Sequence, residues 1–200
     1  MHLSITNILC ILIGIISGLS FSKYDVLNRF SLQPYRVKYN KEYFRLITHA
    51  TLHKDMAHLF FNLFALFSFG NAVESQMKSE LYVILFVGAV LFATIPAMYK
   101  QHNNAYYQSI GASGGVSAVM MFFMVLFPDV ELLFFFILPL PGWAAVILFF
   151  GLEYYMNKKS GTGIAHDAHI SGAIFGLLFL LILHPTAYIR FFQAVSNSIF

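Results

Sequence analysis

Residues 111–115 read Gly-Ala-Ser-Gly-Gly, which places Ser113 between small residues. In soluble α/β-hydrolases a Gly-x-Ser-x-Gly pattern marks a nucleophile on a sharp turn between a strand and a helix. Here the pattern leads into an apolar helical segment of a chain that looks membrane-bound, which excludes that fold. Two interpretations remain open. Ser113 is the nucleophile of another kind of site, or the glycines are small residues that let two membrane helices approach closely.

A second polar pair, His58 and Asn62, lies in another apolar segment. Four-residue spacing puts both side chains on one face of a helix. His49 and His53 precede them with the same spacing. Polar side chains are costly at membrane depth and usually face an interior site. Hydrogen-bonded packing is the simpler alternative. A metal site is disfavoured, because the carboxylates and cysteines that usually complete one are lacking.

A third signal is His169, followed by Gly172 and Gly176 on the same helix face. The glycines allow this helix to press against a neighbour. If that neighbour is the helix that carries Ser113, the serine and the histidine come within hydrogen-bonding distance. That is the minimum arrangement for an activated nucleophile.

Together the three signals predict an acyl-transfer site, which needs a nucleophile, a base and donors for an oxyanion. Ser113 is the expected nucleophile and His169 the expected general base. Asn62, His58 and the backbone N–H of Ser113 are the expected oxyanion donors. Asp167 should point away from His169, so a Ser–His dyad is predicted. The other acidic residues considered as partners also look unsuitable: Glu74, Asp129, Glu131 and Glu153.

The composition indicates a membrane protein, since 58% of the 200 residues are apolar and 10% are charged. A soluble domain carries roughly 25% charged residues. A spanning helix needs ~20 apolar residues, and six runs come close to that length. The prediction is an all-α, multi-pass membrane protein in a single domain, 1–200. Its helices are expected at about 3–21, 57–75, 80–99, 112–127, 142–156 and 168–184.

Two of the six runs have alternative interpretations. The run 3–21 could be a signal peptide, but it lacks a basic n-region and a clear cleavage site, which favours a retained helix. In the fifth run, Pro139-Leu140-Pro141-Gly142 should break a helix. The spanning part is therefore expected to begin near Gly142, with 130–138 along the interface or re-entrant; one kinked helix is the alternative. Cys10, the only cysteine, is expected to be an inert residue of the first helix.

The His58/Asn62 pair lies on the second run, Ser113 on the fourth and His169 on the sixth. In this order along the chain, the motifs resemble the rhomboid family of intramembrane serine proteases. The matching residues are Gly111-Ala112-Ser113-Gly114, His58-x-x-x-Asn62 and Ala168-His169-x-x-Gly172-x-x-x-Gly176. The resemblance covers nearly the whole chain. It implies a six-helix bundle that cleaves transmembrane protein substrates within lipid, without a metal or cofactor.

The resemblance also implies roles by position. Ser113 corresponds to the nucleophile, His169 to the base, and His58 and Asn62 to the oxyanion-stabilising pair. Residues 22–56 correspond to a long, partly embedded first loop, and 157–166 to a loop that caps the active site. Arg45 matches the arginine of an aromatic-Arg pair, with Phe44 where tryptophan is common.

The chain departs from the family pattern at two positions near the expected site. Ser117 stands where several bacterial relatives have an aromatic residue that packs under the catalytic histidine, so another side chain must orient His169. His166 stands in the cap loop where a smaller amide is familiar. We expect it to be solvated, with a role in pH behaviour as the alternative.

The charges and the resemblance disagree on orientation. With the amino terminus inside, only Lys78 and Arg190 of the twelve Lys and Arg residues are inside, against the positive-inside rule. The resemblance implies this orientation all the same, with the site opening outward. A bacterial plasma membrane is the expected location.

The motifs allow three classes of function. An active serine endopeptidase is favoured, because both Ser113 and His169 are present. A catalytically inactive binding protein of the same fold is the first alternative. A small transporter is the second, disfavoured because paired intramembrane carboxylates are absent. The sequence shows no basic run typical of nucleic-acid binding.

Overall fold

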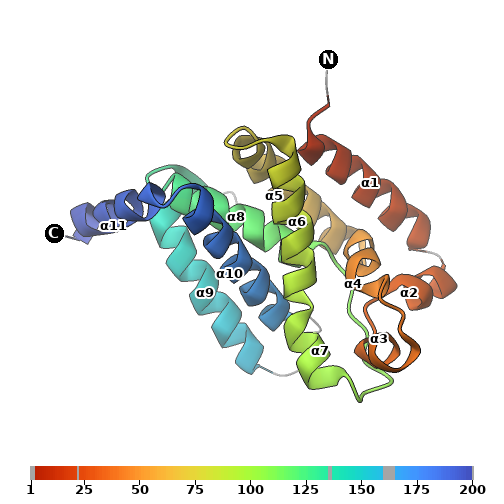
Figure 1. The fold of residues 1–200 in the computed structure, drawn as a ribbon. Helices are drawn as coiled ribbons and strands as arrows, with labels where there is room; N and C mark the ends of the chain where they lie inside the picture. The colour runs from red at the N-terminus through yellow and green to blue at the C-terminus, as the bar shows by residue number, and fades with distance from the viewer. Residues whose placement is uncertain (1–2, 22, 135–136, 160–164, 200) are drawn as a thin grey trace.

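The protein is described by a computed structural model that covers residues 3–21, 23–134, 137–159 and 165–199. It is mostly helical (Figure 1). Three helical segments are long and apolar enough to cross a membrane: α5 (Met56–Glu74), α6 with α7 (Ser79–Gln101) and α10 (His166–Leu183). Two shorter apolar helices accompany them, α1 (Ile5–Ser20) and α8 (Ser113–Leu126). The chain is thus built as an integral membrane protein.

Helix α8 is the centre of the fold. Most of its side chains are buried, including Met121 and Phe122, which are fully enclosed. Figure 1 shows α8 between α5 on one side and α10 on the other, with α6 crossing in front. Helix α9 (Gly142–Lys158) packs against both α8 and α10. A helix that is apolar all round is expected to be enclosed in this way. Ser113 is the first residue of α8, so its position depends on how the neighbouring helices hold α8.

Helices α8 and α10 touch through their backbones. A Cβ atom added at Gly172 would lie 2.7 Å from the carbonyl carbon of Gly114 and would collide with its oxygen. One added at Gly176 would lie 2.7 Å from Cα of Ala118. Small residues permit such close crossings. The sequence expectation that these glycines pack against the helix of Ser113 is therefore confirmed.

Helix α1 is held against the end of α5 by Glu74. The Glu74 carboxylate accepts hydrogen bonds from the backbone N–H groups of Ile5 and Thr6, at 2.8 and 2.9 Å, and from the Thr6 hydroxyl at 2.9 Å. The first N–H groups of a helix have no partner within the helix, and an acidic group there is favourable. The first run is thus an integral part of the packed bundle.

The connection between α1 and α5 contains short helices: α2 (Tyr24–Phe30), α3 (Pro34–Asn40), α4 (Arg45–Thr48) and the 3₁₀ turn η1 (His49–Thr51). Arg45 holds them together from a fully buried position. Its Nε donates to Glu42 at 2.6 Å, and its Nη1 donates to the carbonyl oxygens of Asn28 and Ser31 at 2.9 Å. The guanidinium lies 5.4 Å from the Phe44 ring, so the two residues of the expected pair are in contact.

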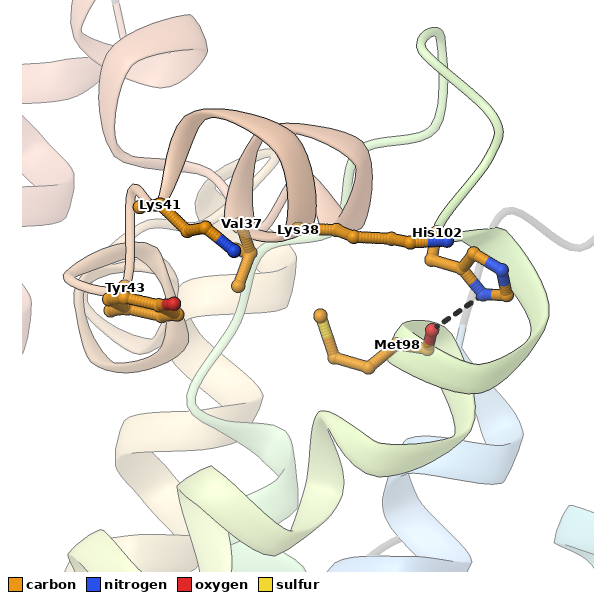
Figure 2. A pocket seen from close by; sticks show the side chains of 6 residues that line it. All are labelled: Val37, Lys38, Lys41, Tyr43, Met98 and His102. Atoms are coloured by element: carbon orange, nitrogen blue, oxygen red, sulfur yellow. Dashed lines mark hydrogen bonds between the residues drawn. The ribbon is translucent and has the colours of Figure 1, made fainter.

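A cavity of about 350 Å³ lies between this connection and α7 (Ile95–Gln101). Figure 2 shows Lys38 and Lys41 along its upper side, Met98 below, and His102 at the far end of the Lys38 side chain. His102 is held there by a 3.1 Å contact between its Nδ1 and the carbonyl oxygen of Met98. Ser113 and His169 do not line this cavity, so it is separate from the predicted site.

The segment between α8 and α9 is not helical in its described residues. It forms an antiparallel hairpin of β1 (Glu131–Phe134) and β2 (Leu138–Pro141), with Leu133 opposite Pro139. The alternative of one kinked helix is wrong, and the all-α class needs this exception. Proline lacks the N–H that a helix interior requires, whereas a strand with a free edge tolerates it. Helix α9 begins at Gly142, as expected.

Two further helical features bear on the predicted boundaries. Helix α11 (Thr186–Ile199) follows α10 and was not predicted. Of the predicted cap loop 157–166, residues 160–164 lie outside the described part of the chain, and His166 is the first residue of α10.

The α8–α10 contact predicts a strong dependence on glycine. Gly176→Val should lower the melting temperature, because the valine must push the two helices apart; overpacking of this kind costs about 1–3 kcal/mol or more. Gly151→Val is the matched control, since a Cβ at Gly151 meets nothing within 4 Å. Thermal unfolding of both variants in the same detergent checks this, and equal melting temperatures would contradict the tight crossing.

Candidate active site

Ser113 and His169 are brought together by the α8–α10 contact. The hydroxyl oxygen of Ser113 lies 2.7 Å from Nε2 of His169. Ser113 is the first residue of α8, and His169 lies in the first turn of α10. Both are partly buried rather than fully enclosed. The structure thus joins two residues that are 56 positions apart in the sequence.

A carboxylate completes this pair. Oε1 of Glu153, on α9, lies 3.0 Å from Nδ1 of His169. The sequence interpretation that none of the acidic residues partners His169 is therefore wrong for Glu153. In the sequence Glu153 lies near the end of an apolar run, where a carboxylate is common. Spacing along the chain does not show that α9 packs beside α10. Asp167 does point elsewhere, and it pairs with Lys100 at 3.0 Å.

His166 shares the same carboxylate. Its Nδ1 lies 2.7 Å from Oε2 of Glu153, and the side chain is only 6% exposed. The expectation of a solvated loop histidine is wrong. Residues 166 and 169 are three apart on one helix, so their rings project from the same face towards α9.

The hydrogen bonds define the proton positions on His169. An ionised carboxylate only accepts hydrogen bonds, so Nδ1 of His169 must carry a proton. In the neutral ring Nε2 then has a free lone pair and accepts the proton of the Ser113 hydroxyl. This tautomer is the one in which the histidine can act as a base towards the serine.

The loop before Ser113 is held by the segment that precedes α5. The backbone N–H of Gly111 donates to the carbonyl oxygen of His49 at 3.0 Å, and that of Ala112 donates to Nε2 of His53 at 3.4 Å. Gly111 has φ +130°, a region that side chains other than hydrogen rarely adopt. A Cβ there would also lie 2.9 Å from the His58 ring.

His58 lies beside this loop on α5, and Asn62 follows one helical turn later. The closeness of the His58 ring to Gly111 brings it to the serine's own loop. The amide nitrogen of Asn62 donates to the carbonyl oxygen of His58 at 2.9 Å. Asn62 is buried, whereas His58 is half-buried. The structure therefore brings His58 to the loop before α8, whereas Asn62 lies one turn further along α5 and uses one amide N–H within that helix.

His49 and His53 hold the chain rather than face the serine. Nδ1 of His49 donates to the carbonyl oxygen of Arg45 at 3.0 Å. Nδ1 of His53 lies 2.8 Å from the hydroxyl of Ser17, which donates to the carbonyl oxygen of Thr51 at 2.7 Å. The bonds of His53 connect α1 to the loop that supports Ser113. The ring nitrogens that make these bonds are engaged by protein groups.

Within the described ranges, the group with three potential metal-ligand atoms close together is Glu153, His166 and His169, all within 4.8 Å of one another. Each short nitrogen–oxygen distance in the group is accounted for by a hydrogen bond from a ring N–H to the carboxylate.

The chain is similar in sequence to proteins of a known family. The model of the Rhomboid domain family matches residues 40–186. The chain is 26% identical to RHOMBOID-like protein 12, mitochondrial, of Arabidopsis thaliana, over 76% of this chain and 50% of that protein. It is 26% identical to Rhomboid protein 1, mitochondrial, of Saccharomyces cerevisiae, over 67% of this chain and 40% of that protein. It is 36% identical to Rhomboid protease GluP of Bacillus subtilis, over 38% of this chain and 14% of that protein.

The relatives also correct one expectation. The chain spans about half the length, or less, of the mitochondrial relatives it matches. Because these relatives are mitochondrial, the predicted location in a bacterial plasma membrane is not supported.

The buried histidines of the supporting loop predict a pH-dependent stability. Burial lowers the pKa of His53 from 6.5 to about 3 and that of His49 from 6.5 to about 4. Both rings are neutral in the folded protein but take up a proton below pH 6.5 when it unfolds. Their contribution is therefore complete above pH 6.5 and is lost as the pH falls towards 4, at up to ~1.4 kcal/mol per pH unit for each ring.

His53→Gln isolates one of these contributions, since the amide can still accept from Ala112 and does not titrate. Its melting temperature should fall less steeply than that of the wild type between pH 6.5 and 4.5. Parallel curves for the two proteins would show that His53 is not held neutral by the fold.

Proposed function

The chain belongs to the rhomboid family, and we propose that it is an intramembrane serine endopeptidase that cleaves transmembrane helices of other proteins. The observation that carries the proposal is the 2.7 Å contact between the Ser113 hydroxyl and Nε2 of His169 at the amino terminus of α8. Nucleophile and base within hydrogen-bonding distance are the signature of covalent catalysis by serine. The match to the family over residues 40–186 supports it independently.

In the proposed reaction, Nε2 of His169 removes the hydroxyl proton as Oγ of Ser113 attacks the scissile carbonyl carbon. The tetrahedral intermediate collapses, the C–N bond breaks, and His169 returns the proton to the leaving amine. Water then attacks the acyl-enzyme with His169 again as base, and the serine is restored. No cofactor enters these steps.

The negative oxygen of the intermediate is assigned to donors at the start of α8. The backbone N–H of Ser113 belongs to the first turn, whose N–H groups lack partners within the helix, and the positive end of the helix dipole favours an anion there. The second amide N–H of Asn62 and the ring of His58 are the proposed additional donors. Such donors act most strongly where water is excluded.

The proposed membrane arrangement has six crossings in a single domain, 1–200. They are α1, α5, α6 with α7, α8, α9 and α10. Three of these meet the length and apolarity of a crossing by themselves, and α1 and α8 are shorter apolar helices. Lipid and transmembrane protein substrates are then the partners, and the site at the end of α8 gives water access to the acyl-enzyme.

Replacing either residue of the pair should abolish proteolysis. Ser113→Ala and His169→Ala should each reduce cleavage of a model transmembrane substrate in detergent by at least about 10³-fold. The double variant should be no worse, because the two residues act as a unit. Melting curves verify that the variants are folded. Substantial cleavage by folded Ser113→Ala would refute the serine mechanism, and inhibition of the wild type by a chelator would indicate a metal instead.

The oxyanion role predicts a separate effect for Asn62. Asn62→Ala should lower kcat by about 10²-fold with little change in KM, since the donor acts mainly in the transition state. Asn71→Ala is the matched control on α5, because the Asn71 amide also donates to the carbonyl oxygen four residues earlier. It should lower stability but leave kcat near the wild-type value. If Asn62→Ala shows only a lower melting temperature, Asn62 has a packing role alone.

A further inference from the structure

Glu153 is an ionisable residue turned inward on a helix whose neighbouring side chains face outward. Leu152, Tyr154 and Tyr155 are 42%, 58% and 55% exposed, whereas the Glu153 side chain is 16% exposed. A carboxylate removed from water at membrane depth is costly unless it is paired, and such residues are usually functional. Here both oxygens are used, Oε1 by His169 and Oε2 by His166.

We propose that Glu153 is a positioning residue for His169, so that the reactive unit is Ser113–His169–Glu153 rather than a Ser–His dyad. The inference rests on the proposed function and specifies how the base is held. The carboxylate accepts the Nδ1 proton of His169 at 3.0 Å, which leaves Nε2 free to receive the serine proton. Glu153 itself is not protonated in the reaction; its charge stabilises the imidazolium that forms.

The need for such a residue follows from Ser117. One turn after the nucleophile, Ser117 is buried within α8 and is too small to cover the ring of His169. A ring held only by its bond to the serine could rotate or adopt the other tautomer. The hydrogen bond from Nδ1 to Glu153 restricts both, and it does so from α9, on the side of the ring away from Ser113.

His166 holds the carboxylate in turn. Its 2.7 Å bond to Oε2 fixes the second oxygen, so rotation of the carboxylate would break a bond at either end. The two histidines on α10 therefore both bond to one residue of α9, where the two helices pack together. This arrangement offsets the cost of burying the charge and keeps Oε1 directed at His169.

The first test compares Glu153→Gln with Glu153→Asp. A glutamine replaces one of the two carboxylate oxygens by an NH2 group that only donates, so one of the two histidines loses its acceptor. We expect kcat to fall by about 10²-fold, the cost typical of a misplaced reacting group, with KM little changed. Aspartate keeps the charge on a shorter side chain and should recover part of the loss. Glu80→Gln, at an exposed carboxylate in the first turn of α6, is the control and should behave as the wild type.

A second readout separates positioning from a purely structural role. The rate constant for labelling of Ser113 by a fluorophosphonate measures the reactivity of folded molecules, so a smaller folded fraction lowers the amplitude and not the rate. We expect this rate constant to fall in Glu153→Gln in parallel with kcat. The imidazole ¹⁵N shifts of His169, identified by their loss in His169→Gln, should show a changed Nδ1/Nε2 proton distribution.

The outcomes distinguish this inference from the proposed function. Wild-type kcat and labelling rate in Glu153→Gln would overturn the role of Glu153 while leaving the Ser113–His169 mechanism intact. A wild type that neither cleaves nor labels would overturn the proposed function itself. Loss of wild-type activity on chelation, restored by Zn²⁺, would show a metal-dependent reaction, for which Glu153, His166 and His169 are the ligand group in the described ranges, and would also overturn the positioning role. If Glu153→Gln fails to fold, the kcat and labelling rate of Glu153→Asp provide the test. Reduced values would support the positioning role of Glu153, and wild-type values would overturn it.

Discussion

The two backbones at the crossing of α8 and α10 leave no space for a side chain. Gly172 faces Gly114 and Gly176 faces Ala118, and a Cβ at either glycine would overlap the opposite backbone. This contact sets the separation of the helices that carry Ser113 and His169, and hence the 2.7 Å distance between their reactive atoms. A helix pair separated by larger side chains would hold the same residues too far apart for proton transfer. The glycines therefore matter to the site although they carry no functional groups.

Several buried polar groups around the site have partners that limit their movement. Glu153 accepts hydrogen bonds from two histidines. His53 is bonded to the Ser17 hydroxyl and to the N–H of Ala112. Arg45 donates to three groups of the first connection. In surroundings that exclude water an unpaired polar group is costly, so such networks hold a fixed geometry. The loop before Ser113 is therefore fixed from α1 and from the segment before α5, while His169 is fixed from α9.

Much of this arrangement could be predicted from the sequence. The lengths of the apolar runs predicted the helices that carry the site, and the Gly172–Gly176 spacing predicted the face of α10 that meets α8. The roles of Glu153 and His166 could not be predicted, because they depend on which helices are neighbours, and a carboxylate near a helix end is common. The hairpin was missed for a related reason: the prolines of 139–142 show where a helix stops but not that the preceding residues pair. The spacing of His49 and His53 indicated one helix face, but it could not show which groups their rings bond.

The central claim is that Ser113 is a nucleophile activated by His169. The most direct measurement is mass-spectrometric mapping of the covalent adduct after treating the folded protein in detergent with a fluorophosphonate. If His169 activates Ser113, the wild type should carry a single stoichiometric adduct on Ser113, and folded His169→Ala should carry none. An adduct that forms equally well without His169, or no adduct on Ser113 in folded wild-type protein, would contradict this claim.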